Sequence, residues 1–258
     1  MLRKLLKYDL KSGLRTFCVV WMGIAVLTGL VCLIFSFDAE NNTAILMIGV
    51  LTMIPLMFGV IGAILYSNVF VALRFYNGLL GQEGYLMFTL PASPWKLLTS
   101  KLLTAILFVC GTAVISLLSI GFMLNAMVGT LGMDLSMMFE MTGLDLSLTE
   151  GTVLTIVSYV LNGIMGILQI YLACCLGHLC RTKRVLFSVL FYFAINTAIS
   201  LISSIIQIVM VSGSALMDSS LGALSQASMG YTMGLNVGLS VLFFVICERI
   251  LRTKLNLE

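Results

Sequence analysis

The run CCLGHLC, Cys174 to Cys180, contains residue types that could bind a metal ion. Cys174 and His178 are four residues apart, so on a helix they share one face, and thiolates and imidazoles are common zinc ligands. A structural zinc site needs four converging ligands, whereas helix geometry turns Cys175 away from that face. We therefore expect no metal site, and we interpret His178 as a helix-end residue that faces lipid head groups.

The sequence also lacks the residues that catalysis within a membrane requires. An intramembrane protease needs two aspartates or a serine paired with a histidine, and His178 is the single histidine of the chain. A proton- or sodium-coupled carrier needs an intramembrane carboxylate or a broken helix, and a voltage sensor needs a row of arginines. The long apolar runs of the sequence contain no charged residue. We expect that the chain is not an enzyme, and that it is neither an ion-coupled carrier nor a voltage sensor.

The composition explains this lack of charge, because 60% of the residues are apolar and only 10% are charged. A helix needs about 20 apolar residues to cross the hydrocarbon layer, and backbone groups in lipid must pair within the helix. The sequence therefore predicts an all-α, polytopic membrane protein in which residues 1–258 form a single membrane-spanning domain. Six predicted transmembrane helices cover residues 16–37, 45–72, 102–128, 152–177, 185–211 and 230–247.

The basic residues predict how these helices cross the membrane. All 14 lysines and arginines fall before the first span, between the second and third, between the fourth and fifth, or after the sixth. Cytoplasmic loops retain lysine and arginine, so these regions, with both termini, are expected on the cytoplasmic side. The opposite loops carry acidic residues and no basic residue. We therefore expect a multi-pass protein of the plasma membrane whose positive inner face attracts anionic membrane lipid; no nucleic-acid-binding motif is present.

The longest predicted cytoplasmic loop, residues 74–101, contains both turn residues and apolar side chains. The stretch RFYNGLLGQEGYLMFTL predicts a short helix that ends at Pro91, and WKLLTSKLL predicts a second helix that starts at Ser93 and Pro94. Proline cannot continue a helical hydrogen-bond ladder, but it fits the first helical position. A helical loop with apolar side chains at residues 85–90 should dock on another surface.

The same loop contains, in order, Glu83, Gly84, Tyr85, Leu86, Pro91, Ser93 and Lys101. This order resembles the loop after the second span in permease subunits of ABC-2-type exporters. There a glutamate and a glycine are followed by a leucine, a proline-serine turn and a lysine that opens the third span. Tyr85 departs from the pattern, because threonine is common at that position. The resemblance implies that the residues from Glu83 to Ser93 contact a partner ATPase and couple it to the permease.

The amino-terminal stretch LRKLLKYDLKSGLRTF predicts an amphipathic helix, with apolar residues on one side and basic residues on the other. Such a helix lies in the membrane interface, and its candidate interfacial residues are Lys4, Lys7, Tyr8, Lys11 and Arg15. An ordinary positive flank that fixes orientation explains the same residues equally well. Permeases of this family often begin with an interfacial helix, have six spans and place both termini inside, so the resemblance in organisation covers the whole chain.

The resemblance also implies a partner, because the chain has no GxxxxGK[ST] phosphate-binding loop. The cassette ATPase, with its ATP and Mg²⁺, would be a separate polypeptide, and this chain itself would need no cofactor. The loop would convert nucleotide-driven movement of the ATPase into helix movement. Two permeases, as a homodimer or as a heterodimer with a related chain, would enclose the path of the substrate.

Uncharged polar residues inside the spans are candidates for this path, although interhelical hydrogen bonding is their commoner role. They are Asn162, Gln169, Asn196 and Gln207. Gly230, Gly234 and Gly238 form a stripe along the sixth span on which another helix can approach closely, within the chain or in a dimer. The polar residues and the 17 methionines indicate an amphipathic or hydrophobic substrate, such as a peptide, a drug or a lipid.

Two other functions fit the same sequence. A non-transporting immunity or sensor protein could use this scaffold, and an uncoupled channel or secondary carrier would move its substrate without an ATPase. The leading hypothesis is the permease subunit of an ATP-driven exporter that moves its substrate outward. Co-purification with a cassette ATPase would favour this hypothesis over the channel or carrier.

Overall fold

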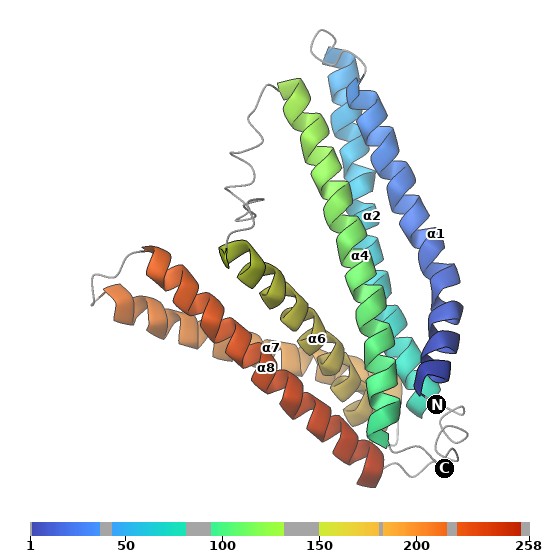
Figure 1. Cartoon of the computed structure of the whole chain (residues 1–258), viewed down its shortest axis with the longest axis vertical. Helices are drawn as coiled ribbons and strands as arrows, with labels where there is room; N and C mark the ends of the chain where they lie inside the picture. Colours follow the sequence, from blue (N-terminus) through green and yellow to red (C-terminus); the bar gives the residue numbers. More distant parts are fainter. Residues whose placement is uncertain are drawn as a thin grey trace. The chain divides into compact units, whose positions relative to one another are not determined.

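The computed structural model describes residues 2–36, 43–80, 94–131, 150–180, 183–215 and 221–253. This part of the chain is helical and contains no strand. Figure 1 shows the helices in chain order. They are α1 (Leu2–Ser36), α2 (Thr43–Phe75), the π-helix η1 (Tyr76–Leu80), α4 (Pro94–Leu131), α6 (Glu150–His178), α7 (Arg184–Ala215) and α8 (Leu221–Thr253).

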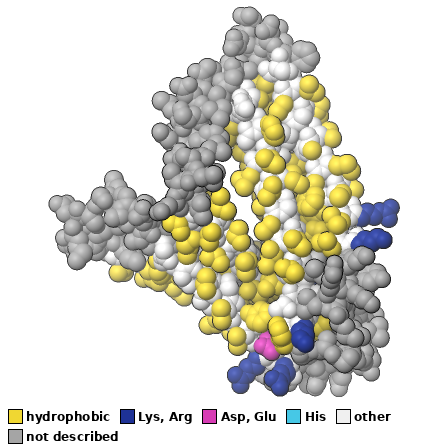
Figure 2. Space-filling model, viewed as in Figure 1, with side chains coloured by type: hydrophobic (Ala, Val, Ile, Leu, Met, Phe, Trp, Pro, Cys, Tyr) yellow, Lys and Arg dark blue, Asp and Glu magenta, His cyan; other side chains and the backbone are white. Residues whose placement is uncertain are grey.

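Within the described ranges, six helices are long and apolar enough to cross a membrane. Their apolar segments are Leu10–Ser36, Met47–Leu79, Trp95–Ala126, Ile156–His178, Arg184–Val209 and Gly230–Arg252. Figure 2 shows hydrophobic side chains over much of the surface, and Phe58 and Ile208 are 70% and 68% exposed. Lipid favours such a surface and water does not. The predicted all-α fold is confirmed for the described residues, and so is the prediction of six helices that are long and apolar enough to cross a membrane.

The chain divides into two compact units. Unit 1 comprises Met1–Phe70 and Leu103–Thr152, and unit 2 comprises Val71–Leu102 and Val153–Glu258. The division falls inside α2, α4 and the first turn of α6, so each of these helices contributes residues to both units. That residues 1–258 form a single membrane domain stays a prediction.

Aromatic rings form the centre of unit 1. Phe17 of α1 is fully buried and stacks on Phe108 of α4, with ring centroids 4.5 Å apart. Phe70 and Tyr66 of α2 meet the same Phe17 ring edge-on, at 4.9 Å and 5.7 Å. Such edge-to-face and stacked pairs add to the stabilisation that comes from burial alone. One phenylalanine of α1 therefore joins the three long helices of this unit.

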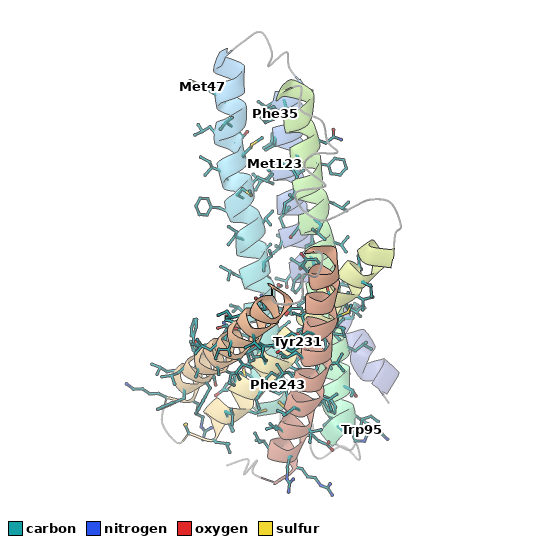
Figure 3. The ribbon with its side chains drawn as sticks, turned by 90° about the vertical axis from the view of Figure 1, so that its left-hand side faces the viewer. Phe35, Met47, Trp95, Met123, Tyr231 and Phe243 are labelled. Atoms are coloured by element: carbon teal, nitrogen blue, oxygen red, sulfur yellow. The ribbon has the colours of Figure 1, made fainter. Side chains whose placement is uncertain are left out.

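A second contact in unit 1 depends on a glycine. The indole Nε1 of Trp21 donates a hydrogen bond of 3.2 Å to Thr112 Oγ1, which joins α1 to α4. A Cβ atom at Gly111 would lie 2.8 Å from the Trp21 ring, so only glycine leaves room for this approach. Farther along the helices, Phe35 of α1 packs in one buried cluster with Met123 of α4, and both are labelled in Figure 3.

In unit 2, α6 is the most buried of the candidate spans and α7 the least. α7 and α8 contact each other. The turn after α6 is closed by hydrogen bonds of 3.2 Å from Leu179 N to Leu176 O and from Cys180 N to Gly177 O. A Cβ atom at Gly177 would lie 2.6 Å from Ser188 Cα, so this glycine allows the start of α7 to pack against α6.

Two local predictions can be compared with the helix boundaries. α4 begins at Pro94, as the sequence predicted, but WKLLTSKLL is not a separate short helix. It forms the first turns of α4, because no helix-breaking residue lies between it and the span. At the amino terminus, α1 runs from Leu2 to Ser36 as one helix. The amphipathic stretch and the first span therefore share one helix, and the interfacial position of the stretch stays a prediction.

Candidate functional site in unit 2

In unit 2, segment 81–93 is flanked by a π-helix on one side and by the start of α4 on the other. α2 changes to a π-helix at Tyr76–Leu80, directly before the segment, and α4 begins at Pro94, directly after it. Short π-helices are rare and occur frequently at functional sites. Gly78 and Leu79 of the π-helix are buried, as are Leu97 and Leu98 of α4. Both described ends of the segment are therefore packed into the protein.

The predicted coupling residues themselves lie outside the described residues. They are Glu83, Gly84, Tyr85, Leu86, Pro91 and Ser93. Their contact with a partner ATPase stays a prediction. What the structure describes is how the chain is held on either side of them.

A tyrosine of α6 contacts the chain on both sides of segment 81–93. The Tyr171 ring stacks on Phe75, the last residue of α2, with centroids 4.0 Å apart and an interplanar angle of 15°. Its hydroxyl donates a 3.1 Å hydrogen bond to the backbone oxygen of Lys101 in α4. Phe75 and Tyr171 are 1% and 2% exposed. Because a buried hydrogen bond is directional and costly to break, this side chain fixes the end of α2 relative to the start of α4.

Lys101 also crosses from α4 to the π-helix. Its side chain is buried, and a Cβ atom at Gly78 would lie 3.2 Å from Lys101 Nζ. The ammonium group thus lies near the carboxyl-terminal end of the continuous α2–η1 helix, where the helix dipole favours a cation. We call Phe75, Gly78, Lys101 and Tyr171 the anchor cluster.

His178 adds a ring contact to the same π-helix. It is the last residue of α6, and its imidazole meets the Tyr76 ring edge-on with centroids 6.1 Å apart. The Nδ1 atom is buried and has no hydrogen-bond partner within the described part of the chain. In those residues no group of three or more histidine, cysteine or acidic side chains is arranged to hold a metal ion. His178 therefore contacts the π-helix by its ring, and the head-group contact expected for it stays a prediction.

The structure also brings together two cysteines that the sequence left unconnected. Cys175 in α6 and Cys247 in α8 lie close together, and both residues are fully buried. The helix geometry that turns Cys175 away from Cys174 and His178 points it towards α8. The only signal in the sequence was that both cysteines lie near the ends of their apolar runs.

The other predicted site residues have different surroundings. Gln169 is buried, whereas Asn162, Asn196 and Gln207 are exposed. Gly230, Gly234 and Gly238 are exposed, with nothing within 4 Å of where a Cβ would stand. Lys11 and Arg15 of α1 are exposed, while the side chains of Lys4, Lys7 and Tyr8 lie outside those the structure describes. The use of all these residues in a path, a dimer or the interface stays a prediction.

Comparison of the chain with protein-family models, with curated proteins and with solved structures gives no match. The helices and their exposed apolar side chains define the class, a multi-pass helical membrane protein with six candidate spans in the described ranges. A more particular assignment rests on the residues of the chain itself, foremost on segment 81–93 and the anchor cluster beside it.

Proposed function

We propose that the chain is the transmembrane permease subunit of an ATP-driven exporter of the ABC-2 type. It moves an amphipathic or hydrophobic substrate, such as a peptide, a drug or a lipid, outward across the plasma membrane. The observation that carries the proposal is the anchor cluster, because it links both flanks of segment 81–93, which has the exporter-like motif, to α6.

The anchor cluster supports this function through its stiffness. A segment that receives force from a partner must be connected to the spans by contacts that do not yield, since a loose connection would absorb the movement. The stacked Phe75 ring and the buried Lys101 carbonyl meet at one tyrosine of α6. A push on segment 81–93 would therefore move the ends of α2, α4 and α6 together.

The partners of the proposed permease follow from what the chain lacks. The ATPase is a separately encoded cassette protein that binds ATP and Mg²⁺, because the sequence has no phosphate-binding loop of its own. Both termini and segment 81–93 are on the cytoplasmic side, where the basic residues concentrate. Two permeases form the transporter.

The experiment is reconstitution of the full chain in proteoliposomes with the cassette ATPase that the proposal predicts from a neighbouring gene. Glu83→Lys is expected to lower permease-stimulated ATP hydrolysis, because it reverses a charge in the segment that meets the ATPase. Glu140→Lys, the same reversal in the predicted outer segment, is the matched control and is expected to leave hydrolysis unchanged. Equal hydrolysis by a fully assembled Glu83→Lys transporter would remove segment 81–93 from the proposal. Substrate movement without any ATPase would identify a channel or carrier instead.

A further inference from the structure

The buried face of α8 has a cysteine at its centre. Phe243, Cys247 and Leu251 are 5%, 0% and 4% exposed, and their spacing of four residues places them in one stripe along the helix. Cys175 of α6 is also fully buried and lies close to Cys247. Both cysteines belong to unit 2, so their proximity is internal to this unit.

Two neighbouring thiols have a reaction that a single buried thiol does not have. All seven cysteines of the chain are free thiols, and a single one in a core acts as a small apolar side chain. A pair from two helices can also be oxidised to a disulfide. The predicted topology places Cys175 and Cys247 near the cytoplasmic ends of their spans. Thiols on that side are kept reduced, and the disulfides that form there are usually transient and redox-sensing.

The place of the two cysteines in their helices allows oxidation under particular conditions only. Cys175 lies in the last turn of α6, which ends at His178, and Cys247 lies in the last two turns of α8, which ends at Thr253. Buried thiols are unreactive while the helices stay packed. Helix ends open locally more readily than helix centres, and such an opening admits a small uncharged oxidant.

We propose that Cys175 and Cys247 form a reversible disulfide, which links α6 to α8 when a membrane-soluble hydroperoxide reaches them. The thiolate of one cysteine attacks an oxygen of the hydroperoxide, the O–O bond breaks, an alcohol leaves, and the cysteine becomes a sulfenic acid. The second thiol attacks that sulfur, the S–S bond forms, and the hydroxyl leaves with the thiol proton as water. The two thiols lose two electrons, and the hydroperoxide gains them. A cytoplasmic thiol reverses the reaction by thiol–disulfide exchange.

The disulfide would act next to the anchor cluster. Cys175 follows Tyr171 by four residues, so the two side chains leave the same face of α6 one turn apart. Tyr171 holds both flanks of segment 81–93. A covalent link at Cys175 fixes this part of α6 to α8, so a push on the segment no longer moves it. This consequence rests on the proposed function, whereas the formation of the disulfide does not.

The first experiment detects the disulfide in the full chain, in lipid bilayers and without any ATPase. tert-Butyl hydroperoxide is the oxidant, N-ethylmaleimide blocks the thiols that stay free, and the peptides are identified by mass spectrometry without reduction. We expect a product that joins Cys175 to Cys247, about 2 Da lighter than the two peptides together, and that dithiothreitol removes. Cys174→Ala is the matched control, because it removes the neighbouring buried thiol and should leave the product intact. Cys175→Ala should abolish it.

Three results of this experiment would overturn the inference. If Cys175 and Cys247 are both blocked by N-ethylmaleimide after oxidation, their thiols have not reacted with each other. A disulfide between Cys174 and Cys247 would mean that the neighbouring thiol is the partner. A sulfinic acid at Cys175 or Cys247 without any disulfide would mean that the second thiol is out of reach of the first.

The second experiment measures the consequence for transport. The permease alone is oxidised, the oxidant is removed, and the cassette ATPase that the proposed function predicts is then added. The oxidised chain is expected to lose its stimulation of ATP hydrolysis and to regain it after dithiothreitol, whereas Cys247→Ala should keep its stimulation throughout. A disulfide that leaves the stimulation unchanged would overturn the effect on α6. A chain that forms the disulfide but stimulates no ATPase even when reduced keeps the Cys175–Cys247 site and loses the proposed function.

Discussion

Both units combine ring packing with a hydrogen bond between helices, but they are built around different contacts. In unit 1, one buried phenylalanine, Phe17, joins α1, α2 and α4 through stacked and edge-on rings. In unit 2, buried polar groups cross between helices, as Tyr171 does when its hydroxyl reaches Lys101 O. Ring packing depends on shape and tolerates small shifts, whereas a buried hydrogen bond holds two atoms at one distance and angle. Under the proposed function, unit 1 is the scaffold, and the buried Tyr171 contacts of unit 2 transmit the movement.

The largest expected effect comes from removing the centre of unit 1. Phe17→Ala is expected to lower the free energy of unfolding by about 3–5 kcal/mol, because it deletes a fully buried ring and leaves a cavity. Thermal unfolding in detergent micelles measures the loss. Phe122→Ala, which removes a 58% exposed ring from the same unit, is the control and should change stability by less than about 1 kcal/mol. Equal losses for both variants would mean that the ring cluster is not the scaffold of unit 1.

The next effect tests a steric contact in unit 2. Gly177→Ala places a Cβ atom 2.6 Å from Ser188 Cα, so the backbone at the start of α7 must shift. We expect a loss of about 1–3 kcal/mol, measured by the same unfolding experiment. Gly163→Ala is the matched control in α6, because nothing lies within 4 Å of its added methyl group. It should be neutral or slightly stabilising, since alanine is the better helix former.

Removing one interhelical hydrogen bond from each unit has a smaller effect and compares the roles of the two units directly. Tyr171→Phe keeps the stacked ring but loses the hydrogen bond to Lys101 O, and Thr112→Val keeps the Trp21 ring but loses the corresponding hydrogen bond in unit 1. Each variant is expected to lose about 1 kcal/mol of stability. Only Tyr171→Phe should also weaken permease-stimulated ATP hydrolysis, by up to about fivefold. If Thr112→Val weakened hydrolysis equally, the proposed difference in role between the units would disappear.

The sequence predicted the spans because lipid imposes a simple requirement. An apolar run of about 20 residues has no alternative to a helix in the hydrocarbon layer, and a proline that fits the first helical position marks the start of α4 at Pro94. The helices extend beyond the apolar runs. α4 begins at Pro94, eight residues before the predicted span 102–128, because a formed helix continues until a residue stops it.

The anchor cluster could not be predicted in the same way. Core-facing and lipid-facing sides of these helices are both apolar, so hydrophobic periodicity does not indicate which way a side chain points. The stack of Phe75 on Tyr171 depends on the rotation of α6, which no local pattern specifies. Lys101 gave a partial signal, since it completes the exporter-like motif, but its approach to Gly78 depends on the π-helix.

The smallest expected effect examines that approach. Gly78→Ala places a methyl group 3.2 Å from Lys101 Nζ, and the flexible end of the lysine can move aside, so stability should change by less than about 1 kcal/mol. The displaced ammonium group leaves the end of the α2–η1 helix, and we therefore expect a modest fall in ATP hydrolysis at unchanged protein yield. Lys101→Met in the Gly78→Ala background tests the cause, because a chain without the ammonium group has nothing left to displace. If Gly78→Ala lowers hydrolysis further in that background, the effect comes from the π-helix backbone and Lys101 is not part of the coupling.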